Sequence, residues 1–169
     1  MSGLLVRLAD AADFPAVARL TVAAYEADGQ LKGEHGYGAV LADVSTRAAS
    51  GEVLVAVDEA TGAVLGSVTF VLPGTPFAEL CGPGEAEFRM LAVDPAVQGR
   101  GVGAALAQAC VRRAAELGCA AVVICVRAGM AVSAHRLYER LGFVRMPEKD
   151  WSPLEGVALL GLRLDLPRT

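Results

Sequence analysis

The stretch FRMLAVDPAVQGRGVG, from Phe88 to Gly103, decides how this chain folds. It begins as an apolar strand, turns sharply at Asp94 and Pro95, and then enters a helix through three alternating glycines. A helix that starts at such a turn leaves its first backbone N–H groups without partners, at the positive end of its dipole. Because these groups bind phosphate, the stretch predicts a strand–turn–helix unit that holds a phosphate-bearing ligand.

Length and composition predict one compact domain over residues 1–169. The chain is 54% hydrophobic, which supports a single core and leaves no room for a second domain of usual size. Its net charge of −4 lacks the basic footprint of a nucleic-acid-binding protein. No apolar run approaches the roughly 18–20 residues of a membrane helix, and no signal peptide is visible. We therefore expect a cytoplasmic protein that binds neither nucleic acid nor membranes.

Hydrophobic periodicity predicts a mixed α/β domain with the element order βααβββαβαββ. The helices are expected over residues 10–26, 38–49, from the glycines to about 117, and 131–141. The strands are expected over residues 4–8, 52–57, 64–72, 85–93, 120–126, near 143, and 157–166. The segment 120–126 is continuously apolar, as in a strand buried on both faces, which favours a parallel pairing with the strand 85–93.

The four cysteines have no C-x-x-C spacing, and we expect free, buried thiols and no metal site. They are Cys81, Cys110, Cys119 and Cys125.

A dinucleotide-binding turn is the first alternative to consider for the glycines. Gly99, Gly101 and Ala104 match G-x-G-x-x-G/A by letter. However, five residues separate the strand from the first glycine, and the next strand ends at Arg127 instead of the acidic residue that would bind a ribose. A Walker loop is excluded because no Gly-Lys-Ser/Thr follows.

A second pattern fits better. Gln98-Gly-Arg-Gly101-Val-Gly103 matches Q/R-x-x-G-x-G/A and follows Leu91-Ala-Val-Asp-Pro95, and Leu137-Tyr138-Glu-Arg-Leu-Gly-Phe143 comes about 40 residues later. With both motifs at this separation, the chain resembles the GNAT (GCN5-related N-acetyltransferase) superfamily over its whole length. The resemblance implies a mixed, mostly antiparallel sheet of about seven strands with a central splayed parallel pair, flanked by four helices.

The resemblance also implies acetyl-CoA as co-substrate, without a metal, and acetyl transfer to a primary amine of a small molecule or protein by direct attack on the thioester. The pyrophosphate would lie on the turn, where glycines let the backbone approach closely. Ser133, His135 or a water could replace the family's usual asparagine, which is Ala131 here. Backbone groups of the strand would hold the pantetheine arm and stabilise the oxyanion. The expected cofactor-binding residues are Leu91, Ala92, Val93, Gln98, Gly99, Arg100, Gly101, Val102, Gly103, Ser133 and Tyr138.

Two side chains are expected to be catalytic. Tyr138 matches the family tyrosine that protonates the departing CoA thiolate. Glu87 matches the strand position at which some members keep a glutamate base, although a water relay could replace it. Arg89 shares the face of Glu87, and would either pair with it or bind an acidic acceptor.

The acceptor is expected between two loops, over residues 27–38 and 145–157. Carboxylates and aromatic rings suit a cationic amine. The loops offer Glu34, His35 and Tyr37, and Glu148, Asp150 and Trp151.

Three alternatives stay open at this point. The chain could bind acyl-CoA without turnover, use another acyl-CoA donor, or acylate a hydroxyl group. A homodimer is also expected to be possible, because the long apolar strand at 156–166 would otherwise leave an exposed sheet edge.

Overall fold

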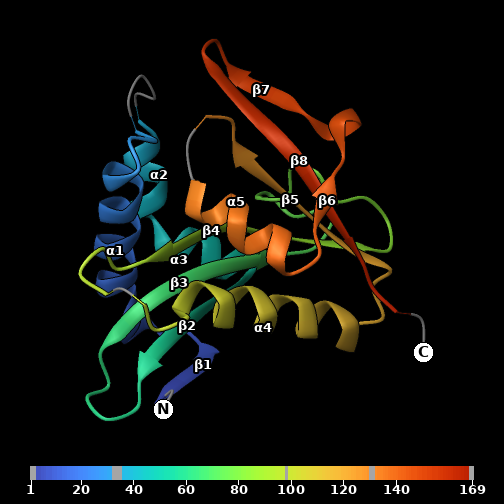
Figure 1. Ribbon diagram of the computed structural model, residues 1–169. Helices are drawn as coiled ribbons and strands as arrows, with labels where there is room; N and C mark the ends of the chain where they lie inside the picture. The colour runs from blue at the N-terminus through green and yellow to red at the C-terminus, as the bar shows by residue number, and fades with distance from the viewer. Residues whose placement is uncertain (1–2, 32–35, 98, 130–131, 168–169) are drawn as a thin grey trace.

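The computed structural model describes residues 3–31, 36–97, 99–129 and 132–167. These residues form one mixed sheet with helices on both of its faces (Figure 1). The helices are α1 (Phe14–Ala27), α2 (Tyr37–Ala42), α3 (Val44–Ser50), α4 (Val102–Glu116) and α5 (Val132–Arg140). The strands are β1 (Leu4–Leu8), β2 (Glu52–Asp58), β3 (Val64–Val71), β4 (Glu85–Val93), β5 (Ala121–Arg127), β6 (Val144–Arg145), β7 (Trp151–Leu154) and β8 (Val157–Asp165).

The sheet has the strand order β1-β2-β3-β4-β5-β8-β6, and β7 pairs with β8. All of these pairings are antiparallel except β4 with β5, which is parallel. The expected mostly antiparallel sheet with a central parallel pair is therefore confirmed.

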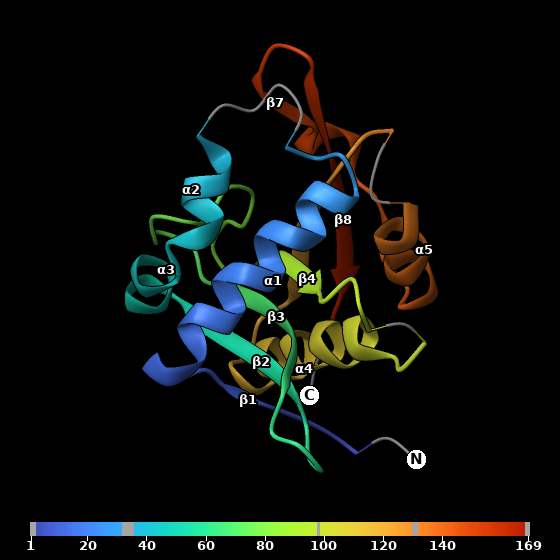
Figure 2. The same cartoon turned by 90° about the vertical axis from the view of Figure 1, so that its left-hand side faces the viewer.

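Two hydrophobic clusters lie on opposite faces of the sheet. The larger one joins the sheet to α4 and α5 and includes Leu106 and Phe143. The smaller one joins β2 to α1 and α3 through Val17, Val44 and Val55. Figure 2 shows α1 crossing β3 and β4, with α4 and α5 on the other side of the sheet.

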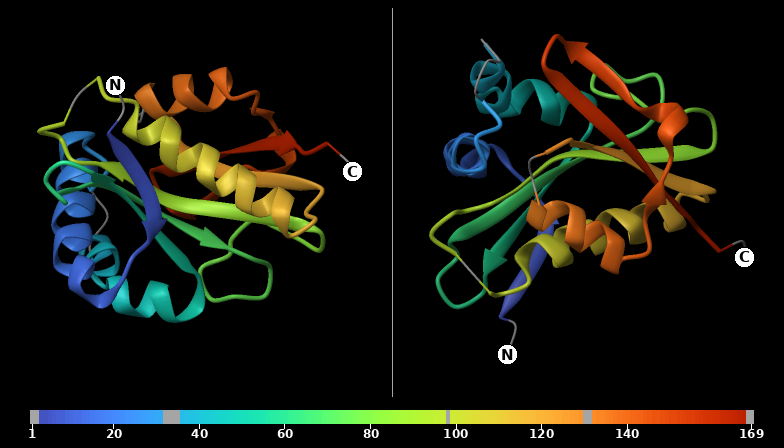
Figure 3. Two further views of the ribbon diagram at one scale, coloured as in Figure 1. Left: turned by 90° about the horizontal axis from the view of Figure 1, so that it is seen from below. Right: turned by 45° about the horizontal axis from the view of Figure 1, so that its top comes forward.

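Two elements differ from the sequence-based expectation. The helix expected over 38–49 is divided at Asp43, whose backbone leaves the helical region (φ −85°, ψ 72°) and whose carboxylate accepts hydrogen bonds from the backbone and hydroxyl of Thr46. The loop expected at 145–157 contains β7, in which Trp151 pairs with Leu159. The β7–β8 hairpin extends beyond the rest of the sheet (Figure 3).

The strands β4 and β5 separate halfway along their length. They pair only where Glu85–Glu87 lies beside Ala121–Val123. Farther along, β4 bulges against β3, because Ser67 pairs with Ala92 while Thr69 pairs with Arg89. Met90 lies in this bulge with φ 57°, which is a left-handed conformation. This conformation is unfavourable in free energy for every residue that has a Cβ atom. The expected splayed pair is thus produced by a bulge in β4.

Candidate active site

Two cavities lie along the separated strands. One has a volume of about 440 Å³ and is lined by the β4–α4 turn, with Asp28 after α1 and Ser133 of α5; we call it the glycine-turn cavity. The other has a volume of about 310 Å³ and includes Arg89 and Arg127; we call it the arginine cavity. Four residues line both cavities, which therefore adjoin at the separated strands: Tyr25, Gln30, Leu91 and Ala134.

The glycine turn has the geometry that phosphate binding requires. Gly99 (φ 70°) and Gly101 (φ 71°) adopt left-handed conformations that favour glycine. Gly101 precedes α4, and no side chain caps this helix. The N–H groups of its first turn therefore have no partner within the helix, at the positive end of its dipole. Val102 and Gly103 line the glycine-turn cavity, whereas Gln98 lies outside the described residues.

The expected phosphate contact Arg100 lines the same cavity but forms an ion pair with Asp58 (2.8 Å). This pair joins the glycine turn to the β2–β3 hairpin. The hydrogen bond from Arg100 lowers the pKa of Asp58, so the carboxylate stays ionised at neutral pH.

The residues Leu91, Ala92 and Val93 all line the glycine-turn cavity. Ala92 and Val93 pair with β3 on one side, and the pairing of β4 with β5 has already ended at Glu87. The β4 edge facing β5 is therefore open at the place where the resemblance puts a pantetheine arm.

Tyr138 reaches the arginine cavity from α5. Its ring makes edge contacts with Phe88 and Phe143, with centroid distances of 5.7 Å in both cases. Burial raises the pKa of the phenol, so Tyr138 keeps its proton at neutral pH. Within the described residues its hydroxyl has no hydrogen-bond partner. Ser133, on the same helix, lines the glycine-turn cavity, and Ala131 lies outside the described residues.

Three charged side chains line the arginine cavity: Glu79, Arg89 and Arg127. Arg89 Nε lies 3.1 Å from Glu79 Oε1, and Arg89 Nη1 donates to the Phe77 carbonyl (3.0 Å). Arg127 donates to the carbonyl of Gln30. Among the described residues, two guanidinium groups and one carboxylate therefore line the same cavity.

Glu87 lies behind the wall of this cavity. Its side chain is 0% exposed, and Oε1 accepts hydrogen bonds from the backbone N–H groups of Glu79 (2.9 Å), Leu80 (2.9 Å) and Cys81 (3.2 Å). Its Oε2 is buried without a hydrogen-bond partner. Glu87 thus holds the loop before β4, and its role as a base stays a prediction.

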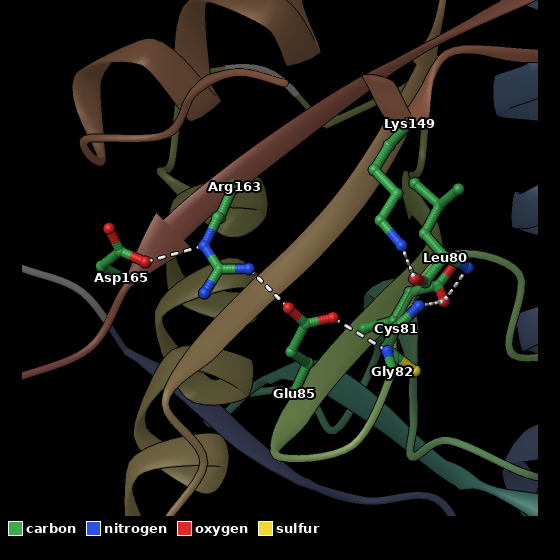
Figure 4. A network of polar contacts seen from close by, with 8 residues as sticks. Leu80, Cys81, Gly82, Glu85, Lys149, Arg163 and Asp165 are labelled. Carbon is green, nitrogen blue, oxygen red and sulfur yellow. Dashed lines mark hydrogen bonds and ion pairs between the residues drawn. The ribbon is translucent and has the colours of Figure 1, made fainter. Parts of the chain in front are cut away.

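Further polar contacts fix the same loop to the C-terminal part of the chain (Figure 4). Glu85 accepts a hydrogen bond from Gly82 N (2.8 Å) and forms an ion pair with Arg163. Lys149 Nζ donates to the Leu80 carbonyl (3.1 Å). The segment that carries Glu79 is consequently tied to three parts of the fold.

Glu79 is the candidate that the sequence-based reasoning missed. Burial raises its pKa, although the charge of Arg89 opposes this effect. The thiol of Cys125 lies 3.8 Å from Glu79 Oε1. No local pattern marks Glu79, because it lies in an irregular loop between β3 and β4.

The other expected acceptor residues are divided between the cavity and its surroundings. Tyr37 and Arg89 line the arginine cavity. The lining found among the described residues includes Pro153 but not Trp151, whose indole N–H is buried without a hydrogen-bond partner. Glu34 and His35 lie outside the described residues.

Asp150 forms an ion pair with Arg145 (2.8 Å).

The four cysteines are free, as expected, but only Cys110 is fully buried. The described residues contain no group of three metal-ligating side chains. They also contain no helix long and apolar enough to cross a bilayer.

The fold and the two cavities fit an acyltransferase that takes its acyl group from a CoA thioester. The family model of the acetyltransferase (GNAT) family matches residues 16–143, and the chain belongs to this family. Acetyl-CoA is the co-substrate of these enzymes. Both the family and the co-substrate agree with the expectation from the two motifs.

Solved structures share the fold over nearly the whole chain. A GCN5-related N-acetyltransferase from Kribbella flavida is 30% identical, with a TM-score of 0.70, over 97% of this chain and 98% of that one. The yncA protein of Salmonella typhimurium, a candidate acetyltransferase solved with acetyl-CoA, is 21% identical (TM-score 0.64; 98% and 95% covered). The ribosomal-protein-S18-alanine N-acetyltransferase of Escherichia coli is 18% identical (TM-score 0.67; 98% and 96% covered). No curated protein matches the chain.

Proposed function

We propose that this protein is an N-acetyltransferase that moves the acetyl group of acetyl-CoA to a primary amine by direct attack on the thioester. The observation that carries the proposal is the junction of the two cavities at Leu91. One cavity has the donors of a phosphate site, and the other has charged side chains suited to an acceptor. The two substrates would therefore meet between the separated strands, without a covalent intermediate on the enzyme.

The residues of the glycine-turn cavity fit acetyl-CoA. The first-turn N–H groups of α4 have no partner within the helix and no side-chain cap among the described residues, and Gly99 and Gly101 carry no Cβ that would keep a phosphate away from the backbone. The open edge of β4 at Leu91–Val93 offers backbone partners for the amide groups of a pantetheine arm. Bound acetyl-CoA supplies the activated acetyl group at the junction.

Two groups of this chain would act on the thioester side. A backbone N–H of β4 near Leu91 would donate to the oxygen that becomes negative during attack. The neutral phenol of Tyr138 would donate a proton to the departing thiolate. The unpaired hydroxyl of Tyr138 and its position in the cavity lining support this role.

Glu79 is the carboxylate that we assign to the amine. It lines the arginine cavity, whereas Glu87 is fully enclosed and engaged with three backbone N–H groups. An amine must lose a proton before or during attack, and a carboxylate with a raised pKa is a more effective acceptor for that proton. In this assignment Glu87 positions Glu79 through the backbone of the loop.

The test is release of CoA thiol from acetyl-CoA over a broad panel of amines, with the acetylated product identified by mass spectrometry. We expect amine-dependent thiol release and an acetylated amine. Tight acetyl-CoA binding without release for any amine would show a binding module instead. Release that requires a longer acyl-CoA, or an alcohol as acceptor, would also contradict the proposal.

A further inference from the structure

The wall of the arginine cavity presents two opposite charges side by side. Arg89 Nε and Glu79 Oε1 are 3.1 Å apart, and the two side chains are 15% and 21% exposed. Both groups line the cavity, so a ligand can contact the carboxylate and the guanidinium at once. The wall is therefore complementary to a molecule that carries an ammonium group and an anion on neighbouring atoms.

The guanidinium of Arg89 has an unused donor. Its Nε faces Glu79, and its Nη1 donates to the Phe77 carbonyl. Its Nη2 makes no hydrogen bond to any described residue and is not enclosed by other protein atoms. A planar guanidinium with a free edge is well suited to binding a carboxylate.

The described part of the cavity lining carries two guanidinium groups, of Arg89 and Arg127, and one carboxylate, of Glu79. The nearby phenols of Tyr25 and Tyr138 are neutral, because burial raises the pKa of each. In a cavity that is partly shielded from solvent, the guanidinium of Arg89 stabilises an anionic group of the ligand more strongly than it would in bulk water.

We propose that the acceptor is a free α-amino acid, with its carboxylate on Arg89 and its amine beside Glu79. This inference rests on the proposed acetyltransferase function and specifies its substrate. An α-amino acid bears the amine and the carboxylate on one carbon, which matches the adjacent charges of the wall. A cavity of about 310 Å³ falls in the range of small-molecule sites. A protein N-terminus has an amide in place of this carboxylate and leaves Arg89 unused.

The first experiment compares matched acceptors on the wild-type enzyme. Each of a panel of L-amino acids is assayed beside its primary amide, its decarboxylated amine and a short peptide that begins with it. For the best side chain we expect kcat/KM to be at least about tenfold higher for the free acid than for the other three forms. An amide, amine or peptide accepted as well as the acid would overturn the inference and leave the acetyltransferase function in place.

The second experiment measures the same acid-to-amide ratio in variants. Arg89→Gln should bring the ratio close to one, and Arg89→Lys should keep part of it, because lysine retains the charge but not the planar edge. Using a ratio removes any general loss of activity that follows from changing the partner of Glu79. Arg113→Gln is the control, since Arg113 forms a similar pair with Glu52 (2.9 Å) that lines neither cavity. A ratio unchanged in Arg89→Gln, or lowered equally in Arg113→Gln, would overturn the inference.

The two levels of the proposal fail differently. If no amine of any kind releases CoA thiol although acetyl-CoA binds, the acetyltransferase function is wrong and the acceptor assignment falls with it. If uncharged amines react and α-amino acids do not, only the acceptor assignment is wrong.

Discussion

Tyr138 and Glu79 enter the arginine cavity from different elements, α5 and the β3–β4 loop. Burial raises the pKa of both side chains, because it disfavours the charged form of each. The phenol stays neutral and remains a proton donor, whereas the carboxylate becomes a stronger proton acceptor. An acid and a base with these properties are what attack by an amine on a thioester requires.

Removal of the hydroxyl oxygen of Tyr138 tests its role as the proton donor. Tyr138→Phe keeps the ring contacts with Phe88 and Phe143, and we expect kcat to fall by about 100-fold because the thiolate leaves without a proton donor. Acetyl-CoA affinity should stay nearly unchanged. Steady-state kinetics together with calorimetric titration check both values, and a wild-type kcat would remove Tyr138 from the mechanism.

The assignment of Glu79 as the base predicts how the reaction rate depends on pH. The raised pKa of Glu79 means that the carboxylate becomes protonated, and inactive as a base, at a higher pH than an ordinary glutamate. As the pH is lowered, the wild-type kcat/KM should therefore begin to decline at a pH above the usual pKa range of a glutamate. Glu79→Gln should lower kcat and remove this acidic limb. An identical limb in the variant would assign the titration to another group.

Glu87 is tested by a substitution that keeps its shape. In Glu87→Gln the side-chain oxygen can still accept from the loop, but the new NH2 group meets the buried place where Oε2 has no partner. We expect a loss of about 1–3 kcal/mol in unfolding free energy and a retained acidic limb. Loss of the limb with unchanged stability, measured by denaturant unfolding and a pH profile, would instead identify Glu87 as the base.

At the scale of elements, the bulge in β4 and the glycine turn before α4 act together. The bulge ends the pairing with β5 and opens a strand edge, and the turn places N–H groups that have no partner within the helix beside that edge. The proposed donor site thus comes from backbone geometry, which needs particular conformations more than particular side chains.

Gly101→Ala tests the turn. Because Gly101 is left-handed (φ 71°), an alanine at this position destabilises the local backbone conformation by about 1–2 kcal/mol. Its methyl group would also lie where the phosphate would approach the start of α4. We expect acetyl-CoA affinity to fall at least about tenfold in calorimetric titrations. The matched control is Gly118→Ala, which has the same conformation (φ 78°) at the other end of α4. Equal affinities in the two variants would place the pyrophosphate elsewhere.

At the scale of the whole molecule, the site depends on segments far apart in the sequence. The loop that carries Glu79 is held by Glu87 of β4, by Lys149 and, through Glu85, by Arg163 of β8. Both sides of the sheet also contribute, since α1 and α5 line the glycine-turn cavity. Binding at this site should therefore stabilise the complete fold.

Acetyl-CoA should raise the melting temperature. At a concentration of about 100 times its dissociation constant, a ligand that binds only the folded chain adds about 2.7 kcal/mol to the free energy of unfolding. For a chain of this size, we expect a shift of roughly 5–10 °C in differential scanning calorimetry. Pantetheine, which lacks the pyrophosphate, should give a clearly smaller shift. Equal shifts for both ligands would contradict the role of the glycine turn.

The sequence by itself determined the fold and the family, and it predicted the donor side of the proposed site. The strand, turn and helix over Phe88–Gly103 and the Leu-Tyr segment of α5 are local patterns, in which hydrophobic period, proline and glycine directly report backbone conformation. These signals need no knowledge of distant neighbours.

Only the tertiary structure shows which side chains line the proposed acceptor side. Glu79 lies in an irregular loop whose course is set by contacts with β4 and the C-terminal part of the chain, and β7 forms because Trp151 pairs with Leu159. Glu87 has the right strand position, but hydrogen bonds with the loop enclose it. Periodicity tells which face of a strand is buried, whereas the side chain that faces a cavity depends on how distant segments meet across the sheet.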